Sequence, residues 1–578
     1  MKKCFRTIMA LAMLVTTSMP MVACGGGEVT SGSDSSSAPV DNSKTQIYVS
    51  NFDGGFGTEW LYNAIERFED LYKETSFEDD KVGVQFHVDP NKNQGNAVSE
   101  LIKGSDTAIY FTQGVDYYSY VNDGLAADIT DIVTGDLSEF GDNKTIESKM
   151  NEQQKNFYKT SEGKYYAIPH YAGYDGIQYD VDLFEKKNFY FAADTSVDAN
   201  TTKYNTALNN GNNGFIYDKN DVKSNGPDGK PNTYDDGLPA TYDEMFLLCD
   251  YIVGAGCTPF IWSGQFRWDY IKGFIASLAV DYEGHDQMML HYTFDGTAEH
   301  LVKSIDNNGK VTFEEPTMIT SENGYELYKS AGKYYGLYFY QTITSNSAYY
   351  HSKSFSDTQS HLLAHQDFLF SRPEAKKPIA MMTEGSYWVN ESKQVFEDIA
   401  GQYGDAYSMN NRKLAIMPTP KVSVDQVGEK YTVMDGLNSV GFINANCKGA
   451  QLDVAKKFLQ FVNTDESLRA FTTTTNSPKS LSYELTDGDL ASMSYYGRQL
   501  WNIKKTVDIV YPFSTNLKYM NNQSKLSFGV NFDSKIGSTV RNYVADELRG
   551  TSSNKVSAKD YFLGIQKQYD AVWWESLN

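Results

Sequence analysis

The hydrophobic positions after residue 44 change period repeatedly, which predicts strands that alternate with helices. Residues 45–50, 82–88 and 106–113 are short, apolar, β-rich runs typical of strands. Between the first two runs, apolar residues recur at helical spacing: Trp60, Leu61, Ala64, Ile65 and Phe68. Strands that alternate with helices predict a parallel sheet with helices on both faces.

In such a sheet, ligands bind beyond the carboxyl ends of the strands. This rule directs attention to the three loops at residues 51–57, 90–96 and 113–117. The first loop contains three glycines, but Trp60 stands where the last glycine of a GxGxxG dinucleotide motif would fall. The sequence therefore gives little support to a nucleotide site.

The N-terminus has the pattern of a secretory signal. A basic start is followed by a short apolar run that is too short to span a bilayer, and then by MVAC, which ends at Cys24. We expect residues 1–23 to be a signal peptide and residues 24–43 to be an acylated cysteine with a flexible Gly/Ser tether. The alternative is an ordinary signal peptide with an incidental cysteine.

Charge and cysteine content narrow the function classes. The 578-residue chain has a formal net charge of −23, so its surface repels nucleic acid and anionic headgroups. Its 42 tyrosines and 32 phenylalanines argue against disorder. Beyond Cys24, the mature chain keeps only Cys249, Cys257 and Cys447, which form no disulfide framework. Burial of Cys249 and Cys257 as thiols is favoured over their pairing.

Several further segments carry a resemblance to a known family. Pro169 is followed by YDVDLF (179–184), and TYDEMFLLCDYIVGAGCTPF spans residues 241–260. KKPIAMMTEGSYWVNE (376–391), the run from Asn438 into DVAKKFLQF, and NSPKSL around Pro478 follow in that order. In this order the segments resemble extracellular solute-binding proteins of the maltose-binding type, family 1. These are lipoprotein components of carbohydrate ABC importers.

The resemblance implies an α/β, two-lobed periplasmic-binding-protein-like fold. Each lobe would be a mostly parallel sheet flanked by helices, and a multi-segment hinge would join them. Lobe 1 would comprise residues 44–170 and 438–478, and lobe 2 residues 174–435 and 479–578, with a polar insertion at 192–239. The hinge would contain His170–Gly173, Asp435–Asn438 and residues near Pro478.

The resemblance also implies a function and its partners. We expect a monomeric, non-enzymatic receptor on the outer face of a bacterial cell membrane, held there only by its lipid anchor. It would capture an oligosaccharide by hinge closure and deliver it to the importer's permease, with no nucleic-acid partner. A surface-anchored glycoside hydrolase or lyase and a glycan-binding adhesin without a transporter are the alternatives.

A sugar site needs aromatic faces for C–H groups and polar side chains for hydroxyls. The predicted loops and crossings contain such pairs, including Tyr171 with Asp175 and Tyr387 with Glu384. Trp388 is the leading candidate because of its place in the family-like segment. The other candidate ligand-binding residues are Trp262, Trp268, Asp116, Tyr117, Tyr174, Asp53, Trp60, Gln265, Glu384, Asp435 and Asn438.

The insertion offers a second kind of chemistry. Four of its side chains are oxygen donors that suit calcium: Asp228, Asn232, Asp235 and Asp236. The EF-hand spacing is absent, and a solvated loop held by Asx turns is the alternative. We expect no cofactor other than this possible structural calcium. His361 and His365 lie four residues apart without the glutamate of HExxH, which favours an ordinary helix-surface pair over zinc.

Overall fold

The computed structural model describes residues 39–194, 214–217, 220–528, 531–550 and 555–577. The expected signal peptide, Cys24, the tether up to residue 38 and part of the insertion lie outside these ranges. In the described part of the chain, no helix is both long and apolar enough to cross a membrane. The cysteines Cys249, Cys257 and Cys447 are buried and free, as the sequence predicted.

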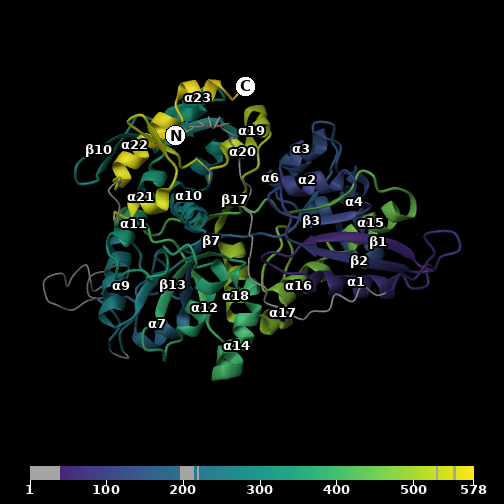
Figure 1. Ribbon diagram of the computed structural model, residues 1–578, viewed down its shortest axis with the longest axis horizontal. Coiled ribbons are helices and arrows are strands. Elements are labelled where there is room, and N and C mark those ends of the chain that lie inside the picture. Colours follow the sequence, from purple (N-terminus) through teal and green to yellow (C-terminus); the bar gives the residue numbers. More distant parts are fainter. Residues whose placement is uncertain (1–38, 195–213, 218–219, 529–530, 551–554, 578) are drawn as a thin grey trace, which may run out of the picture.

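Lobe 1 is built on a five-stranded sheet with the order β2-β1-β3-β16-β6 (Figure 1). The strands are β1 (Thr45–Phe52), β2 (Val84–Asn91), β3 (Ile109–Thr112), β16 (Val440–Ile443) and β6 (Ile168–Pro169). β1 is parallel to β2 and β3, as the alternating pattern predicted. β16 is antiparallel to both β3 and β6.

Lobe 2 has a four-stranded sheet with the order β14-β7-β13-β8. Its strands are β14 (Leu414–Met417), β7 (Asp175–Asp180), β13 (Ile379–Gly385) and β8 (Thr258–Ile261). Only β13 and β8 are parallel; β7 is antiparallel to β13 and to β14. The two-lobed α/β fold is confirmed, but both sheets are more mixed than expected. The reason is that β7 and β16 enter their lobes from the other lobe and run against their neighbours.

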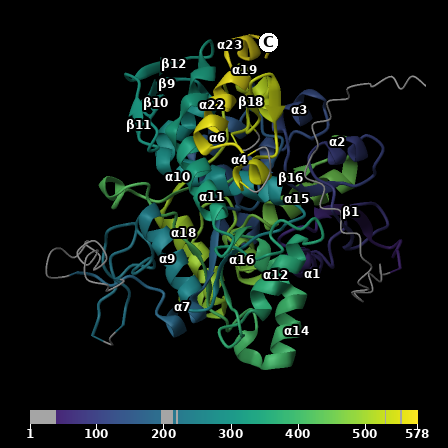
Figure 2. The ribbon, with the colours of Figure 1, turned by 60° about the vertical axis from the view of Figure 1, so that its left-hand side comes forward.

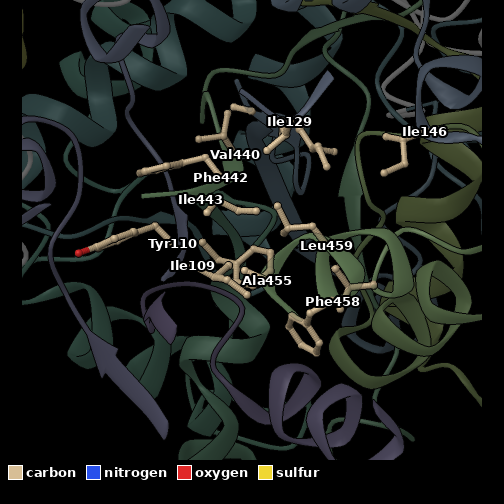
Figure 3. Packing of buried hydrophobic residues seen from close by; sticks show 14 of the residues in the cluster. Ile109, Tyr110, Ile129, Ile146, Val440, Phe442, Ile443, Ala455, Phe458 and Leu459 are labelled. Carbon is tan, nitrogen blue, oxygen red and sulfur yellow. The ribbon is translucent and has the colours of Figure 1, made fainter. Parts of the chain in front are cut away.

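The core of lobe 1 joins segments that are far apart in the sequence. Side chains of β3 and β16 meet those of α15 (Gly449–Phe461) in Figure 3, where Ile109, Phe442 and Phe458 are among the labelled residues. All three are at most 1% exposed. The last third of the chain is therefore needed to complete the sheet that the first third begins.

The helix α1 (Glu59–Leu71) forms where the apolar spacing predicted it, with Trp60, Leu61, Ala64, Ile65 and Phe68 buried. Thr58 lies at its N-cap position but makes no side-chain cap bond. Its hydroxyl donates to Asp53 Oδ1 instead. This bond ties the start of the helix to the preceding loop.

Three segments cross between the lobes and bond to one another. His170 N donates to Ser439 O at 2.9 Å, which links the first and second crossings. Ser480 N donates to His170 O at 3.1 Å and Ala172 N donates to Pro478 O at 3.3 Å, which link the first and third. The crossings therefore form one hydrogen-bonded unit.

The C-terminal extension packs on both lobes, as its course across the middle of Figure 1 and the turned view of Figure 2 show. On α18 (Tyr495–Thr506), Leu500 packs in lobe 2, whereas Trp501 packs in the lobe 1 core. Further along, Phe513 stacks on Phe157 of lobe 1 with ring centroids 4.5 Å apart. The segment expected to belong to lobe 2 thus also supports lobe 1.

Candidate functional site between the two lobes

Asp175 lies at the start of β7, directly after the first crossing. Its side chain reaches solvent, yet crowding by protein atoms raises its pKa to about 6. The neighbouring helix α10 (Arg267–Thr293) presents Gly273, where a Cβ atom would lie 2.8 Å from Asp175 Oδ2. Glycine at position 273 therefore leaves room for the Asp175 carboxylate.

Two tyrosines accompany Asp175. Tyr270 of α10 and Tyr387, just after β13, are both half-buried. Burial, together with the charges of Asp175, Glu384 and Glu391, raises the pKa of both hydroxyls well above the ordinary value. Both tyrosines therefore keep their protons at neutral pH and offer hydroxyl donors beside an aromatic face.

A buried network stands behind these tyrosines. Glu384 Oε2 lies 2.9 Å from His365 Nε2, and Ser392 Oγ lies 2.8 Å from His365 Nδ1. Burial raises the pKa of Glu384 and lowers that of His365 to about 4. Nucleophilic catalysis uses the same three residue types, but here the serine and the histidine are 0% exposed. No substrate can reach this serine, so the network positions the end of β13 instead.

Lobe 1 contacts this part of lobe 2 through the loop that follows β1. The backbone of Gly55 forms a hydrogen bond with Glu391, whose burial raises its pKa to about 7. A Cβ atom at Gly55 would lie 3.2 Å from Tyr387 Cβ, and the ring of Phe56 lies 6.4 Å from that of Tyr387. At the outer edge, Lys393 of lobe 2 forms an ion pair with Glu59 of lobe 1. The lobes therefore touch along one edge of the site.

A wider interlobe cavity of about 850 Å³ lies farther along α10. Lobe 1 lines it with Asn151, Glu152 and Gln153, and lobe 2 lines it at the kink of α10 around Gly284. Asp175, Tyr270 and Tyr387 do not line it. The candidate site remains the group around Asp175, which we call the Asp175 cluster: Asp175, Tyr270, Glu384, Tyr387 and Glu391.

The structure buries several residues that the sequence analysis placed in the site. Trp388 is 0% exposed and packs on Phe368 and Phe396 in the core of lobe 2. Trp262 is 1% exposed and packs on Tyr350 and Phe355. Both rings are core residues in this arrangement of the lobes. The residue before Trp388, Tyr387, is the one that faces lobe 1.

Trp60, Tyr117 and Tyr174 are also at most 5% exposed. Trp60 lies between Phe111 and His170 in lobe 1, and the Tyr117 hydroxyl donates to Tyr158 O at 2.7 Å. Among the aromatic candidates, Trp268 is the most exposed, at 36%.

The polar candidates fall in separate places. Asp53 is exposed in the lobe 1 loop, and Asp116 caps the short helix α3 (Tyr117–Asn122). Gln265 precedes α10, where its backbone N–H donates to Gln359 O at 2.9 Å. Glu384 is in the Asp175 cluster, whereas Asp435 and Asn438 lie in the second crossing. Asn438 has a left-handed backbone with φ of 46°.

The insertion loop proposed for calcium is held by its own backbone. Asp235 Oδ2 accepts from Asp228 N at 2.9 Å, and Asp236 Oδ2 accepts from Asn232 N at 2.8 Å. Crowding raises the pKa of Asp235 to about 6. Across the described residues, no group of three or more His, Cys, Asp or Glu side chains is placed to hold a metal ion. Calcium binding here stays a prediction.

The sequence analysis missed Tyr270 and Glu391 and gave no reason to prefer Asp175 or Tyr387 over their neighbours. The available signal was position: Tyr387 lies just after β13, and Tyr270 stands in the first turn of α10. Which side each residue faces depends on α10 and on the loop from lobe 1, and the local pattern does not contain that information.

Comparison with solved structures agrees with this architecture. A chitin oligosaccharide binding protein matches with a TM-score of 0.51 and 13% identity, over 90% of this chain and 98% of its own. The solute-binding protein RafE, in complex with raffinose, matches with a TM-score of 0.50 and 13% identity, over 91% and 100%. A family 1 extracellular solute-binding protein from Bifidobacterium longum subsp. infantis gives 0.46 at 15% identity, over 91% and 99%.

The similarities to the first two proteins define the class of fold: the chain has the two-lobed fold of extracellular solute-binding proteins. The names of these two proteins describe binding of a chitin oligosaccharide and of raffinose. No family model matches the sequence, and no curated protein is significantly similar to it.

Proposed function

We propose that this protein is an extracellular solute-binding receptor that captures an oligosaccharide between its two lobes and delivers it to an ABC importer. The observation that carries the proposal is the Asp175 cluster, which lies on lobe 2 of a solute-receptor fold and faces lobe 1. The cluster pairs aromatic faces with carboxyl and hydroxyl groups, and a sugar has complementary C–H faces and hydroxyls.

The proposed mechanism is closure about the three crossings. A ligand that contacts the Asp175 cluster and the Gly55 loop together stabilises the closed arrangement by the difference between its affinities for the closed and open forms. Lobe 1 contributes backbone groups and Lys92, whose positive charge acts on Glu391, and lobe 2 contributes most of the side chains. The permease would then recognise the closed form.

The test is a thermal-shift screen of the mature chain carrying Cys24→Ser, which keeps the tether and blocks acylation. Raffinose, xylo-oligosaccharides and chito-oligosaccharides are the probes, with short peptides and polyols as comparison ligands. A sugar at one hundred times its Kd is expected to add about 2.7 kcal/mol to the free energy of unfolding and to raise the Tm. If only peptides raise the Tm, or if no probe raises it, the oligosaccharide assignment is overturned.

Attachment to the outer face of the cell membrane through acylated Cys24 is part of the same proposal. Cells expressing the wild-type chain and fed an alkyne-labelled palmitate are expected to label this protein in the membrane fraction. The Cys24→Ser chain is expected to lose the label and appear in the medium. Labelling of the variant equal to that of wild type would refute the anchor.

A further inference from the structure

The carboxylate of Asp435 contacts all three segments that cross between the lobes. Its Oδ1 accepts from Gly173 N of the first crossing at 3.3 Å and from Leu437 N of the second at 3.4 Å. Its Oδ2 accepts from the hydroxyl of Ser480, in the third crossing, at 3.4 Å. The side chain is 5% exposed. One buried acid thus connects every segment that must rotate when the lobes move.

The surroundings of Asp435 come from several elements. Lys504 of α18 is its cationic neighbour, and the Lys504 ammonium also donates to Leu481 O of the third crossing at 2.6 Å. Four tyrosine hydroxyls lie within its electrostatic reach: Tyr158, Tyr171, Tyr174 and Tyr511. Lys504 is therefore the one cation among these neighbours to balance the Asp435 carboxylate.

We propose that Asp435 is the positioning residue of the hinge, and that its protonated carboxyl holds the three crossings in the arrangement in which the lobes touch. The proposal rests on the receptor function proposed above, because positioning the hinge matters to a protein that closes on a ligand. A buried, ionised carboxylate is costly unless hydrogen bonds replace its hydration, and the three bonds to Asp435 are long, at 3.3–3.4 Å. Ionisation of Asp435 therefore loosens the hinge.

The relevant pH range follows from the environment. Burial raises the pKa of Asp435 to about 7, while its three hydrogen bonds and Lys504 oppose the rise. Burial also lowers the pKa of Lys504 to about 7. In the unfolded chain the Asp435 carboxyl has its ordinary, lower pKa. Between pH 4 and 7 the folded state therefore binds more protons at this site, and its stability at this site falls as pH rises through that window.

The experiment compares three proteins: wild type, Asp435→Asn and Asp425→Asn. Asparagine at 435 keeps the shape and the acceptor oxygen but cannot ionise. Asp425 is an exposed acid of lobe 2 that lies outside the three crossings, and it serves as the matched control. Each protein is measured without ligand at pH 5.5 and 8.5, by small-angle scattering for the radius of gyration and by thermal melting.

At pH 5.5 all three proteins are expected to give the same radius of gyration, since wild-type Asp435 is then largely protonated. At pH 8.5 wild type and Asp425→Asn are expected to be less compact than Asp435→Asn, which cannot ionise. The melting temperature of wild type is expected to decline as the pH rises, and that of Asp435→Asn is expected to decline less. Glu391 and Asp175 titrate in the same range, but their contribution is common to all three proteins.

Two outcomes would overturn the proposal: the same radius for Asp435→Asn and wild type at pH 8.5, or an equal difference at both pH values. Ser480→Ala, which removes a hydroxyl that stabilises the ionised carboxylate, gives a second measurement and is expected to fall between wild type and Asp435→Asn at pH 8.5. Failure of every sugar to bind would remove the receptor function, yet the ligand-free measurements would still decide the role of Asp435.

Discussion

The inner edges of the two lobes differ in what they offer to a ligand. The edge of lobe 1 consists mainly of loop backbone around Gly55, with Asp53 and Lys92 exposed. The edge of lobe 2 presents half-buried tyrosines and carboxyls with perturbed pKa values, supported by a packed core. Under the proposed function, lobe 2 would therefore supply most of the groups that recognise the ligand, and lobe 1 would close over them.

Removal of a core side chain of lobe 2 should have the largest effect on the free energy of unfolding. Trp388→Ala deletes a fully buried ring and is expected to lower the free energy of unfolding by about 3–5 kcal/mol. Urea denaturation measures this loss. Trp268→Ala, at a more exposed site, is expected to cost less than about 1 kcal/mol. If Trp388→Ala instead left stability intact and abolished sugar binding, Trp388 would be a ligand contact, and the division between core and edge would be wrong.

Removal of the aromatic face at the edge comes next. Tyr387→Ala is expected to weaken binding of the sugar found by thermal shift by about tenfold or more, since aromatic contacts contribute about 1 kcal/mol beyond the area they bury. The free protein should melt near the wild-type temperature. Titration calorimetry gives the Kd. Tyr543→Ala, at a site 57% exposed on lobe 2, is the control and should bind normally; equal losses in both variants would contradict the assignment.

On the lobe 1 side, alanine substitutions of two glycines distinguish the cost of backbone strain from the effect of contact with lobe 2. Gly55 and Gly57 have φ of 71° and 70°, but only Gly55 has a neighbour, Tyr387, within reach of a Cβ atom. Alanine at either position is expected to cost about 1 kcal/mol of strain. Gly55→Ala should in addition hinder closure and weaken binding several-fold, as scattering and calorimetry would show. The same Kd for both variants would mean that lobe 1 does not close over the cluster here.

The smallest effect should come from the exposed ion pair between the lobes. Lys393 and Glu59 have side chains 48% and 58% exposed, and such pairs contribute about 0–1 kcal/mol. Glu59→Gln is expected to weaken sugar binding by less than about fivefold at low salt and not at all at 0.5 M NaCl. Glu185→Gln, in an exposed pair within lobe 2, should have no effect. A large loss that persists in salt would show that lobe 1 supplies more of the affinity than the comparison allows.

The sequence by itself determined the local elements and their order. The period of the apolar residues placed α1 and the first strands, because a helix or strand of a packed sheet must bury one face. The burial of Cys249 and Cys257 was also accessible from the chain alone, and the resemblance to a known family implied the fold class and the three crossings near Pro169, Asp435 and Pro478.

Only the tertiary structure decided which side chains face the other lobe. Tyr387 and Trp388 are adjacent and both aromatic, yet one meets Gly55 and the other fills the core against Phe368 and Phe396. Their orientation depends on α10, on the helices behind β13 and on a loop more than 300 residues earlier in the chain. The directions of β7 and β16 were decided in the same way, because each enters its sheet from the opposite lobe. Contacts between such distant segments leave no periodic signal in the local sequence.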